Sequence, residues 1–159
     1  IAALAAAGIR CEVVPGVTAA LAASAELGIA LTQRGLARSI AFVTPRVGAG
    51  AAPSDWARSL VAADAGAIYM GAGEAQAIAA ALIAAGKPAS TPVAVVENAS
   101  LPEARVWYTT LAGLPASVDS GATGPAMILV GPQFRATTGA AHSDVTAPRD
   151  AAFPRTASR

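Results

Sequence analysis

Four short segments carry residues whose types and spacing would suit the binding of a small organic ligand. Each places small or polarizable residues at an end of an apolar run: Thr18-Ala19 after Pro15-Gly16-Val17, Met70-Gly71, Asn98-Ala99 and Gly124-Pro125-Ala126. A Pro-Gly turn that opens a helix leaves free N–H groups near Thr18 and Ala19, which can bind a carboxylate or another polar edge of a ligand. Met70 offers a polarizable surface for an adenine face, while Gly71 and Ala99 remove bulk. Each segment also has an ordinary explanation as a turn, a core residue or, for Glu97-Asn98, a loop cap.

Strands that alternate with helices must position these segments. Apolar runs predict strands at residues 39–44, 67–70, 92–97 and 127–130, and an alternating pattern predicts a fifth strand at 105–110. Helix-favouring runs at 54–63, with Ser54 as its N-cap, 74–85 and 111–118 lie between them. This order predicts an α/β fold, and only a loop separates residues 92–97 from 105–110, which favours antiparallel pairing and a mixed sheet. Ligands of such folds bind beyond the carboxyl ends of strands.

The chain divides into three parts by its pattern. Residues 1–38 contain the end of a helix closed by Gly8, a short strand at 11–14, a helix that begins near Thr18 and ends at Gly28, and a connection. We interpret residues 1–38 as the end of one α/β domain and its crossing to a second, at residues 39–132. Residues 133–159 are small and polar and are predicted to be a disordered tail. Because Ile1 opens inside an apolar helix-favouring run, we expect a fragment of a longer protein.

Composition argues against several classes of function. Charged residues make up 13% of the chain and the net charge is +1, so no nucleic-acid-binding surface is expected. The apolar runs are too short to span a membrane. The lone Cys11 fits a reducing, cytoplasmic compartment. Phosphate-loop, zinc-site, GxSxG and paired-carboxylate patterns are missing, and the single histidine, His142, lies in the predicted tail, so neither a metal site nor a serine hydrolase is expected.

Five strings in the same order resemble those of uroporphyrinogen-III C-methyltransferases, which are tetrapyrrole methylases. They are GIRCEVVPGVTAALAASAELGIALTQR, AIYMG, TPVAVVENAS, residues 103–111 and GPAMILVG. This resemblance implies the tetrapyrrole methylase fold, with two α/β domains, S-adenosyl-L-methionine bound between them, and a homodimer. It implies cofactor contacts by Thr18, Ala19, Met70, Ala99, Pro125 and Ala126. The substrate, uroporphyrinogen III, carries carboxylates, for which arginines are natural partners; the candidates are Arg34, which lies in a family motif, Arg38, Arg46 and Arg105.

The sequence also departs from the family pattern. Ala99 replaces a glycine, Gln33 a histidine and Ala30 a proline. The glycine-rich amino-terminal loop, the Gly-Asp-Pro loop and the proposed acid and base of the family have no counterpart here, so no catalytic residue is assigned. The implied reaction is metal-free double methylation to precorrin-2, in sirohaem and cobalamin synthesis, and we expect this chain alone to be inactive. Two alternatives stay open: another precorrin methyltransferase, and a non-catalytic module for cofactor contact and dimerisation.

Overall fold

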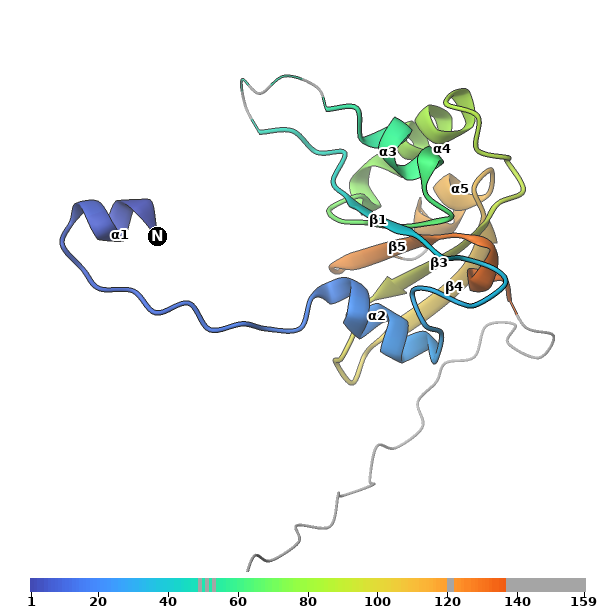
Figure 1. Ribbon diagram of the computed structural model, residues 1–159. Coiled ribbons are helices and arrows are strands. Elements are labelled where there is room, and N and C mark those ends of the chain that lie inside the picture. The colour runs from blue at the N-terminus through green and yellow to red at the C-terminus, as the bar shows by residue number, and fades with distance from the viewer. Residues whose placement is uncertain (49, 51, 53, 120–121, 137–159) are drawn as a thin grey trace, which may run out of the picture.

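A five-stranded mixed sheet forms the centre of the computed structural model, which describes residues 1–48, 50, 52, 54–119 and 122–136 (Figure 1). The strands are β1 (Ile40–Val43), β2 (Ala65–Ile68), β3 (Pro92–Glu97), β4 (Arg105–Thr110) and β5 (Ala126–Val130). Their order in the sheet is β1-β2-β5-β3-β4. β1 and β2 pair in parallel, whereas the other three pairings are antiparallel. The mixed α/β sheet predicted from the sequence is confirmed.

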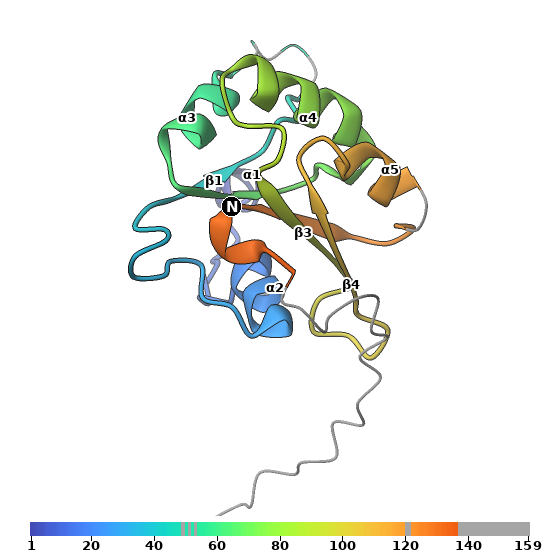
Figure 2. The ribbon, with the colours of Figure 1, turned by 90° about the vertical axis from the view of Figure 1, so that its right-hand side faces the viewer.

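Helices cover both faces of this sheet. On one side lie α3 (Trp56–Ala62), α4 (Ala75–Ala84) and α5 (Leu114–Asp119), and on the other lies α2 (Ala19–Leu27) (Figures 1 and 2). As predicted, α2 ends at Gly28, which adopts the left-handed conformation that a C-cap glycine favours. A further helix, α1 (Ala2–Ala6), stands away from the sheet on an extended, exposed segment. None of the helices in the described residues is long and apolar enough to cross a membrane.

Alternation along the strands gives the two faces different cores. The face under α3, α4 and α5, here called the aliphatic face, is built mainly from branched side chains: Leu60, Ile68, Ile78, Leu82, Val93, Val95, Leu111, Leu114, Ile128 and Val130. The face under α2, here called the alanine face, contains many small residues: Ala20, Ala23, Ala37, Ala65, Ala67 and Ala94, with Leu31, Val96, Met127, Leu129 and Phe134.

Several predicted boundaries are wrong. Residues 11–14 form no strand, because no other described strand lies beside them to complete a ladder of hydrogen bonds. β2 begins two residues earlier than predicted and ends before Met70, which follows it in a left-handed conformation. Asp55, rather than Ser54, is the residue before α3.

The predicted tail also begins too early. The 3-10 helix η2 (Pro132–Phe134) follows β5, and Phe134 is fully buried in the alanine face. Gln133 is buried as well, and its Nε2 donates a hydrogen bond of 2.9 Å to the carbonyl of Leu31. The buried ring of Phe134 and the hydrogen-bonded amide of Gln133 hold this turn against the rest of the fold. The prediction of disorder is therefore wrong for these residues. Residues 137–159 of the predicted tail lie outside the described residues. The division at residue 38 stays a prediction.

Candidate functional site

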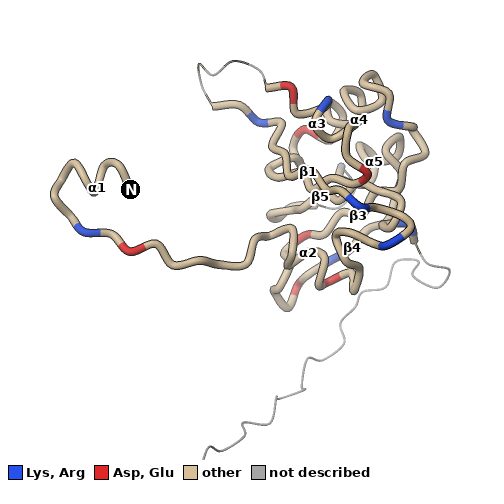
Figure 3. Tube along the Cα trace, in the orientation of Figure 1, with Lys and Arg blue, Asp and Glu red and all other residues tan. Residues whose placement is uncertain are grey.

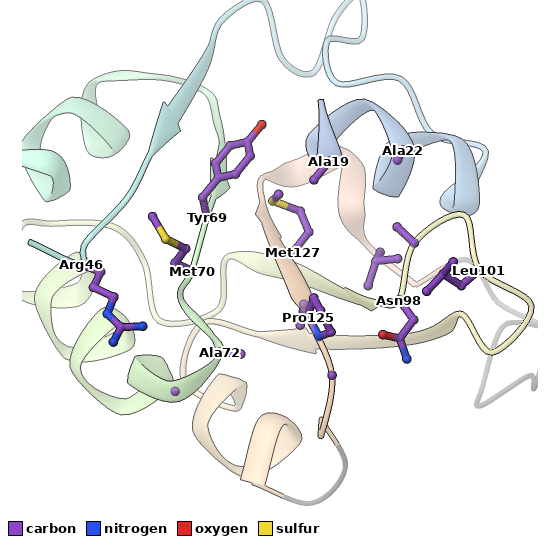
Figure 4. Close-up of a pocket in the computed structure, with 15 residues that line it drawn as sticks. Ala19, Ala22, Arg46, Tyr69, Met70, Ala72, Asn98, Leu101, Pro125 and Met127 are labelled. Carbon is purple, nitrogen blue, oxygen red and sulfur yellow. The ribbon is translucent and has the colours of Figure 1, made fainter. Parts of the chain in front are cut away.

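A cavity of about 490 Å³ opens at one edge of the sheet (Figure 4). The carboxyl ends of β2 and β3 meet the amino end of β5 there, because β5 runs antiparallel to both. The amino end of α2 closes one side. The lining residues are Ala19, Ala22, Arg46, Tyr69, Met70, Ala72, Gly73, Val96, Asn98, Ala99, Leu101, Gly124, Pro125, Ala126 and Met127.

Most of the residues predicted to contact a cofactor line this one cavity. They come from four separate segments and are Ala19, Met70, Ala99, Pro125 and Ala126. Thr18 lies next to them as the N-cap of α2, and its Oγ1 is hydrogen-bonded to the hydroxyl of Tyr69, which lines the cavity. This bond ties the start of α2 to the end of β2. The structure therefore gathers the predicted residues, while their contact with a cofactor stays a prediction.

The four candidate arginines are not gathered in the same way. Arg46 lines the cavity, and Figure 4 shows its side chain beside Met70. Arg34 and Arg38 are exposed and do not line it. Arg105 is bound to Glu97 instead. Basic and acidic residues are scattered along the described chain (Figure 3).

Strained backbone surrounds the cavity. Met70, Asn98 and Ser100 have φ angles of 54°, 52° and 71°, and they are the non-glycine residues of the described chain with positive φ. Such a conformation costs about 1–2 kcal/mol for most residue types, though less for an asparagine such as Asn98, and strained residues gather at functional sites. Two of the three line the cavity, and the third follows Ala99. Glu26 of α2 accepts a hydrogen bond of 2.8 Å from the Ser100 N–H and so helps to hold this loop.

Glu97, at the end of β3, is a fully buried carboxylate with both oxygens engaged. Its Oε1 accepts hydrogen bonds from the backbone N–H groups of Thr123, at 2.5 Å, and of Gly124. Its Oε2 accepts two hydrogen bonds from Arg105, at 2.8 Å from Nε and at 2.5 Å from Nη2. Burial alone would raise the pKa of Glu97, but the Gly124 N–H, the Arg105 guanidinium and the Thr123 N–H together bring that pKa below its ordinary value. Glu97 therefore has a structural role, but it caps the segment before β5, whereas the alternative explanation predicts a cap for the loop that follows Glu97.

Several lining residues were not predicted from the sequence. Ala22 lies three residues after Ala19 on the same helix, so helical spacing would have found it. Tyr69 and Asn98 stand beside predicted residues, whereas nothing in the sequence points to Leu101.

Gly71 requires a correction, because its small size serves the core and not the cavity. Gly71 is buried, and a Cβ there would lie 2.7 Å from Ile78 Cδ1 and 3.2 Å from Ile128 Cδ1 of the aliphatic face. The described residues contain no group of three or more His, Cys, Asp or Glu side chains that could hold a metal ion.

A second cavity, of about 680 Å³, lies between residues 28–36 and 132–136. It is larger, but none of the predicted cofactor or substrate residues lines it. Its lining residues are Gly28, Ile29, Ala30, Gln33, Leu36, Pro132, Gln133, Arg135 and Ala136. The first cavity is the better candidate site because strained backbone and the predicted residues converge on it.

Comparison with known proteins agrees with this fold. Residues 1–115 match the family of Tetrapyrrole (Corrin/Porphyrin) Methylases. The chain belongs to this family. A siroheme synthase of Azotobacter vinelandii is 40% identical over 133 residues, which is 83% of this chain and 29% of that protein. A siroheme synthase of Chromobacterium violaceum is 42% identical over 132 residues, 82% of this chain and 28% of that protein. The chain thus spans less than a third of the length of these relatives.

Solved structures give the same result for the fold. The uroporphyrin-III C-methyltransferase of Thermus thermophilus superposes with a TM-score of 0.69 at 32% identity, covering 81% of this chain and 54% of that one. A second structure of that enzyme, in complex with S-adenyl homocysteine, superposes with a TM-score of 0.68 and covers 56% of its chain. A cobalt precorrin-4 methyltransferase gives a TM-score of 0.72 at 28% identity, over 85% of this chain and 57% of that one. The predicted tetrapyrrole methylase fold is confirmed.

Proposed function

We propose that this tetrapyrrole methylase chain forms one side of the S-adenosyl-L-methionine site of a uroporphyrinogen-III C-methyltransferase. The observation that carries the proposal is the convergence of Ala19, Met70, Ala99, Pro125 and Ala126 on one cavity. A volume of about 490 Å³ is within the range of small-ligand sites. The related Thermus thermophilus enzyme, whose structure contains S-adenyl homocysteine, supports the same cofactor.

The lining fits the parts of this cofactor. Met70 supplies a polarizable side chain, and Ala19 and Ala22 leave room for a ligand against α2. The amino end of α2, whose first N–H groups have no partner within the helix, suits the carboxylate of the amino-acid part. The cofactor supplies an electrophilic methyl group when bound, and these residues would bind and orient it. Positioning of this kind removes much of the entropic barrier to a transfer reaction.

Arg46 is the arginine best placed to meet the carboxylates of a tetrapyrrole. It lines the cavity that would hold the cofactor, on the loop that follows β1. Arg34 and Arg38 do not line this cavity, so roles for them in substrate binding would require the substrate to extend outside it. We therefore expect an Arg46→Ala change in the complete enzyme to weaken substrate binding more than cofactor binding.

The described residues include no assigned acid or base, so we propose that catalysis needs parts of a longer protein. The matched siroheme synthases are more than three times as long as their matched segment. By family resemblance we also propose that the complete protein acts as a homodimer. A precorrin-4 methyltransferase is the second candidate because of its TM-score of 0.72. The 32% identity with the uroporphyrin-III C-methyltransferase of Thermus thermophilus, against 28% with the precorrin-4 enzyme, favours uroporphyrinogen III as substrate.

Calorimetric titration of the chain with S-adenosylhomocysteine tests the proposed cofactor site. We expect a Kd on the order of 10 µM, or about −7 kcal/mol, because one side of a cleft buries only part of the ligand. Ala19→Arg should weaken binding by more than about ten-fold, which corresponds to 1.4 kcal/mol. Ala25→Arg, at an exposed position of the same helix outside the cavity lining, is the matched control. A folded chain that binds no ligand, or binds equally after Ala19→Arg, would refute the proposal.

A further inference from the structure

The Glu97 carboxylate joins three separate segments at the edge of the candidate site. It lies at the end of β3, its Oε2 binds Arg105 at the start of β4, and its Oε1 binds the N–H groups of Thr123 and Gly124 before β5. The strand registers place both Arg105 and Ala126 opposite Glu97. One buried side chain thus fixes the ends of three neighbouring strands.

The segment held by Glu97 leads into a wall of the cavity, formed by Gly124, Pro125 and Ala126. Further contacts bring this wall close to Asn98: the Asn98 N–H donates to the Pro125 carbonyl at 2.9 Å, and a Cβ on Gly124 would lie 2.5 Å from Asn98 Oδ1. Without the carboxylate, the peptide N–H groups of Thr123 and Gly124 would lose their acceptor. The wall would then lose the contact that fixes its amino end.

Arg105 completes the arrangement by balancing the buried charge. A buried carboxylate is stable only when it is paired and fully hydrogen-bonded. The Arg105 guanidinium supplies two hydrogen bonds to Oε2 and also lies 5.1 Å from the ring centroid of Trp107 on the same strand. These contacts orient the guanidinium toward Glu97, so Arg105 acts within the fold rather than as a free cation at the cavity.

We propose that the Glu97–Arg105 ion pair is a positioning device that holds the Gly124–Ala126 wall in the geometry that binds the cofactor. The inference rests on the proposed function, because it assigns the ion pair to the cofactor cavity. Glu97 and Arg105 are positioning residues in this account. Neither one lines the cavity.

Amide NMR spectra of the full chain test the structural part of this proposal without any ligand. The N–H groups of Thr123 and Gly124 should resonate downfield and exchange slowly, because a charged carboxylate accepts both. In Glu97→Gln these two signals should move upfield and their exchange should accelerate by about ten-fold or more. Glu103→Gln removes an exposed carboxylate from the nearby loop and is the matched control. Unchanged Thr123 and Gly124 signals in Glu97→Gln would overturn the proposal whether or not the chain binds a ligand.

Calorimetry with S-adenosylhomocysteine on the same proteins tests the link to binding. Glu97→Gln and Arg105→Gln should each weaken affinity by about ten-fold, while Glu103→Gln should bind like the unmodified chain. Arg105→Lys keeps the charge and should recover part of the affinity lost in Arg105→Gln, which a loss of packing alone would not explain. Full affinity in a folded Glu97→Gln protein would overturn the positioning role alone. If the unmodified chain does not bind the ligand, the proposed cofactor site is refuted. The Thr123 and Gly124 amide signals would still test whether Glu97 holds the wall.

Discussion

The two faces of the sheet use opposite kinds of side chain for opposite purposes. The aliphatic face packs Leu60, Ile78 and Leu82 of its helices against Val95 and Ile128 of the strands. These side chains fill the space beneath α3 and α4 and bury large areas, so this face supplies most of the hydrophobic stabilisation.

The alanine face buries much less per residue. Ala20 and Ala23 of α2 are fully buried in this face, where the helix packs on β5, and their small side chains allow the helix to approach the sheet closely. Beyond this contact, Ala19 and Ala22 leave the edge of the sheet open as a cavity. The comparison teaches that the alanine content of this chain has a structural purpose, because small residues build the face that carries the candidate site.

The largest expected loss of stability comes from a substitution in the aliphatic face. Leu82→Ala removes a fully buried side chain from α4 and should lower the free energy of unfolding by about 2–5 kcal/mol. Ile83→Ala, on the same helix but 39% exposed, should cost less than about 1 kcal/mol. Urea unfolding of both proteins measures the difference. Equal losses would contradict the assignment of the core to this face.

A smaller effect is expected from enlarging a residue of the alanine face. Ala20→Leu should force α2 away from the sheet and cost about 1–3 kcal/mol, because Ala20 is fully buried and no space remains for the added carbons. Ala25→Leu, at an exposed position of the same helix, should change stability by less than about 0.5 kcal/mol. Thermal unfolding followed by circular dichroism compares them. If Ala20→Leu is neutral or stabilising, close packing of small residues does not define this face.

Acid should weaken the fold through Glu97. The pKa of Glu97 is below its ordinary value of 4.5, so below that pH the unfolded chain binds more protons than the folded one. The stabilisation is complete above about pH 5 and is lost as the pH falls through the folded pKa. We expect the urea concentration at the midpoint of unfolding to decrease as the pH is lowered below about 5 in the unmodified chain, and to decrease less steeply in Glu97→Gln. Asp64, whose pKa is also lowered, by the Arg38 N–H, the Ser39 hydroxyl and the Ser39 N–H, should leave a residual slope. If the urea midpoint depends on pH equally in the two proteins, Glu97 does not contribute to the loss of stability in acid.

The smallest effect on stability should accompany a clear effect on binding. Gly124→Ala places a Cβ where the Asn98 amide now lies, so the amide must move and alter the cavity wall. Stability should change by less than about 1 kcal/mol, because the amide is the flexible end of a side chain. Affinity for S-adenosylhomocysteine, measured by calorimetry, should fall several-fold. Gly48→Ala, where an added Cβ meets no atom within 4 Å, is the control. If Gly124→Ala binds with unchanged affinity, the Gly124–Ala126 wall is not part of the binding site.

Much of the fold could be predicted because most of its strands are apolar runs. The bounds of β3 were predicted from its apolar run and those of β4 from its alternating pattern. The bounds of β2 were not, because Tyr69 and Met70 continue the apolar run while the backbone already leaves the sheet. A change of backbone conformation within an apolar run leaves no mark in the hydrophobic pattern.

The residues of the candidate site could be predicted where they belong to the strings that resemble the family. They could not be predicted where contacts between distant segments determine the position of a side chain. The convergence of Ala19, Met70 and Ala99 follows from such strings. The pairing of Arg105 with Glu97 joins two strands, and the type of residue alone suggested a substrate contact for Arg105. The burial of Phe134 depends on the space beneath α2, which no local pattern describes.

Amide NMR can map where S-adenosylhomocysteine binds, because one titration observes both cavities. We expect the largest shift changes at Met70, Asn98 and Ala126, around the first cavity, and no change at Ile29 and Gln33 of the second. Changes centred on Ile29 and Gln33, or spread evenly over the chain, would contradict the assignment of the cofactor to the alanine face at the edge formed by β2, β3 and β5.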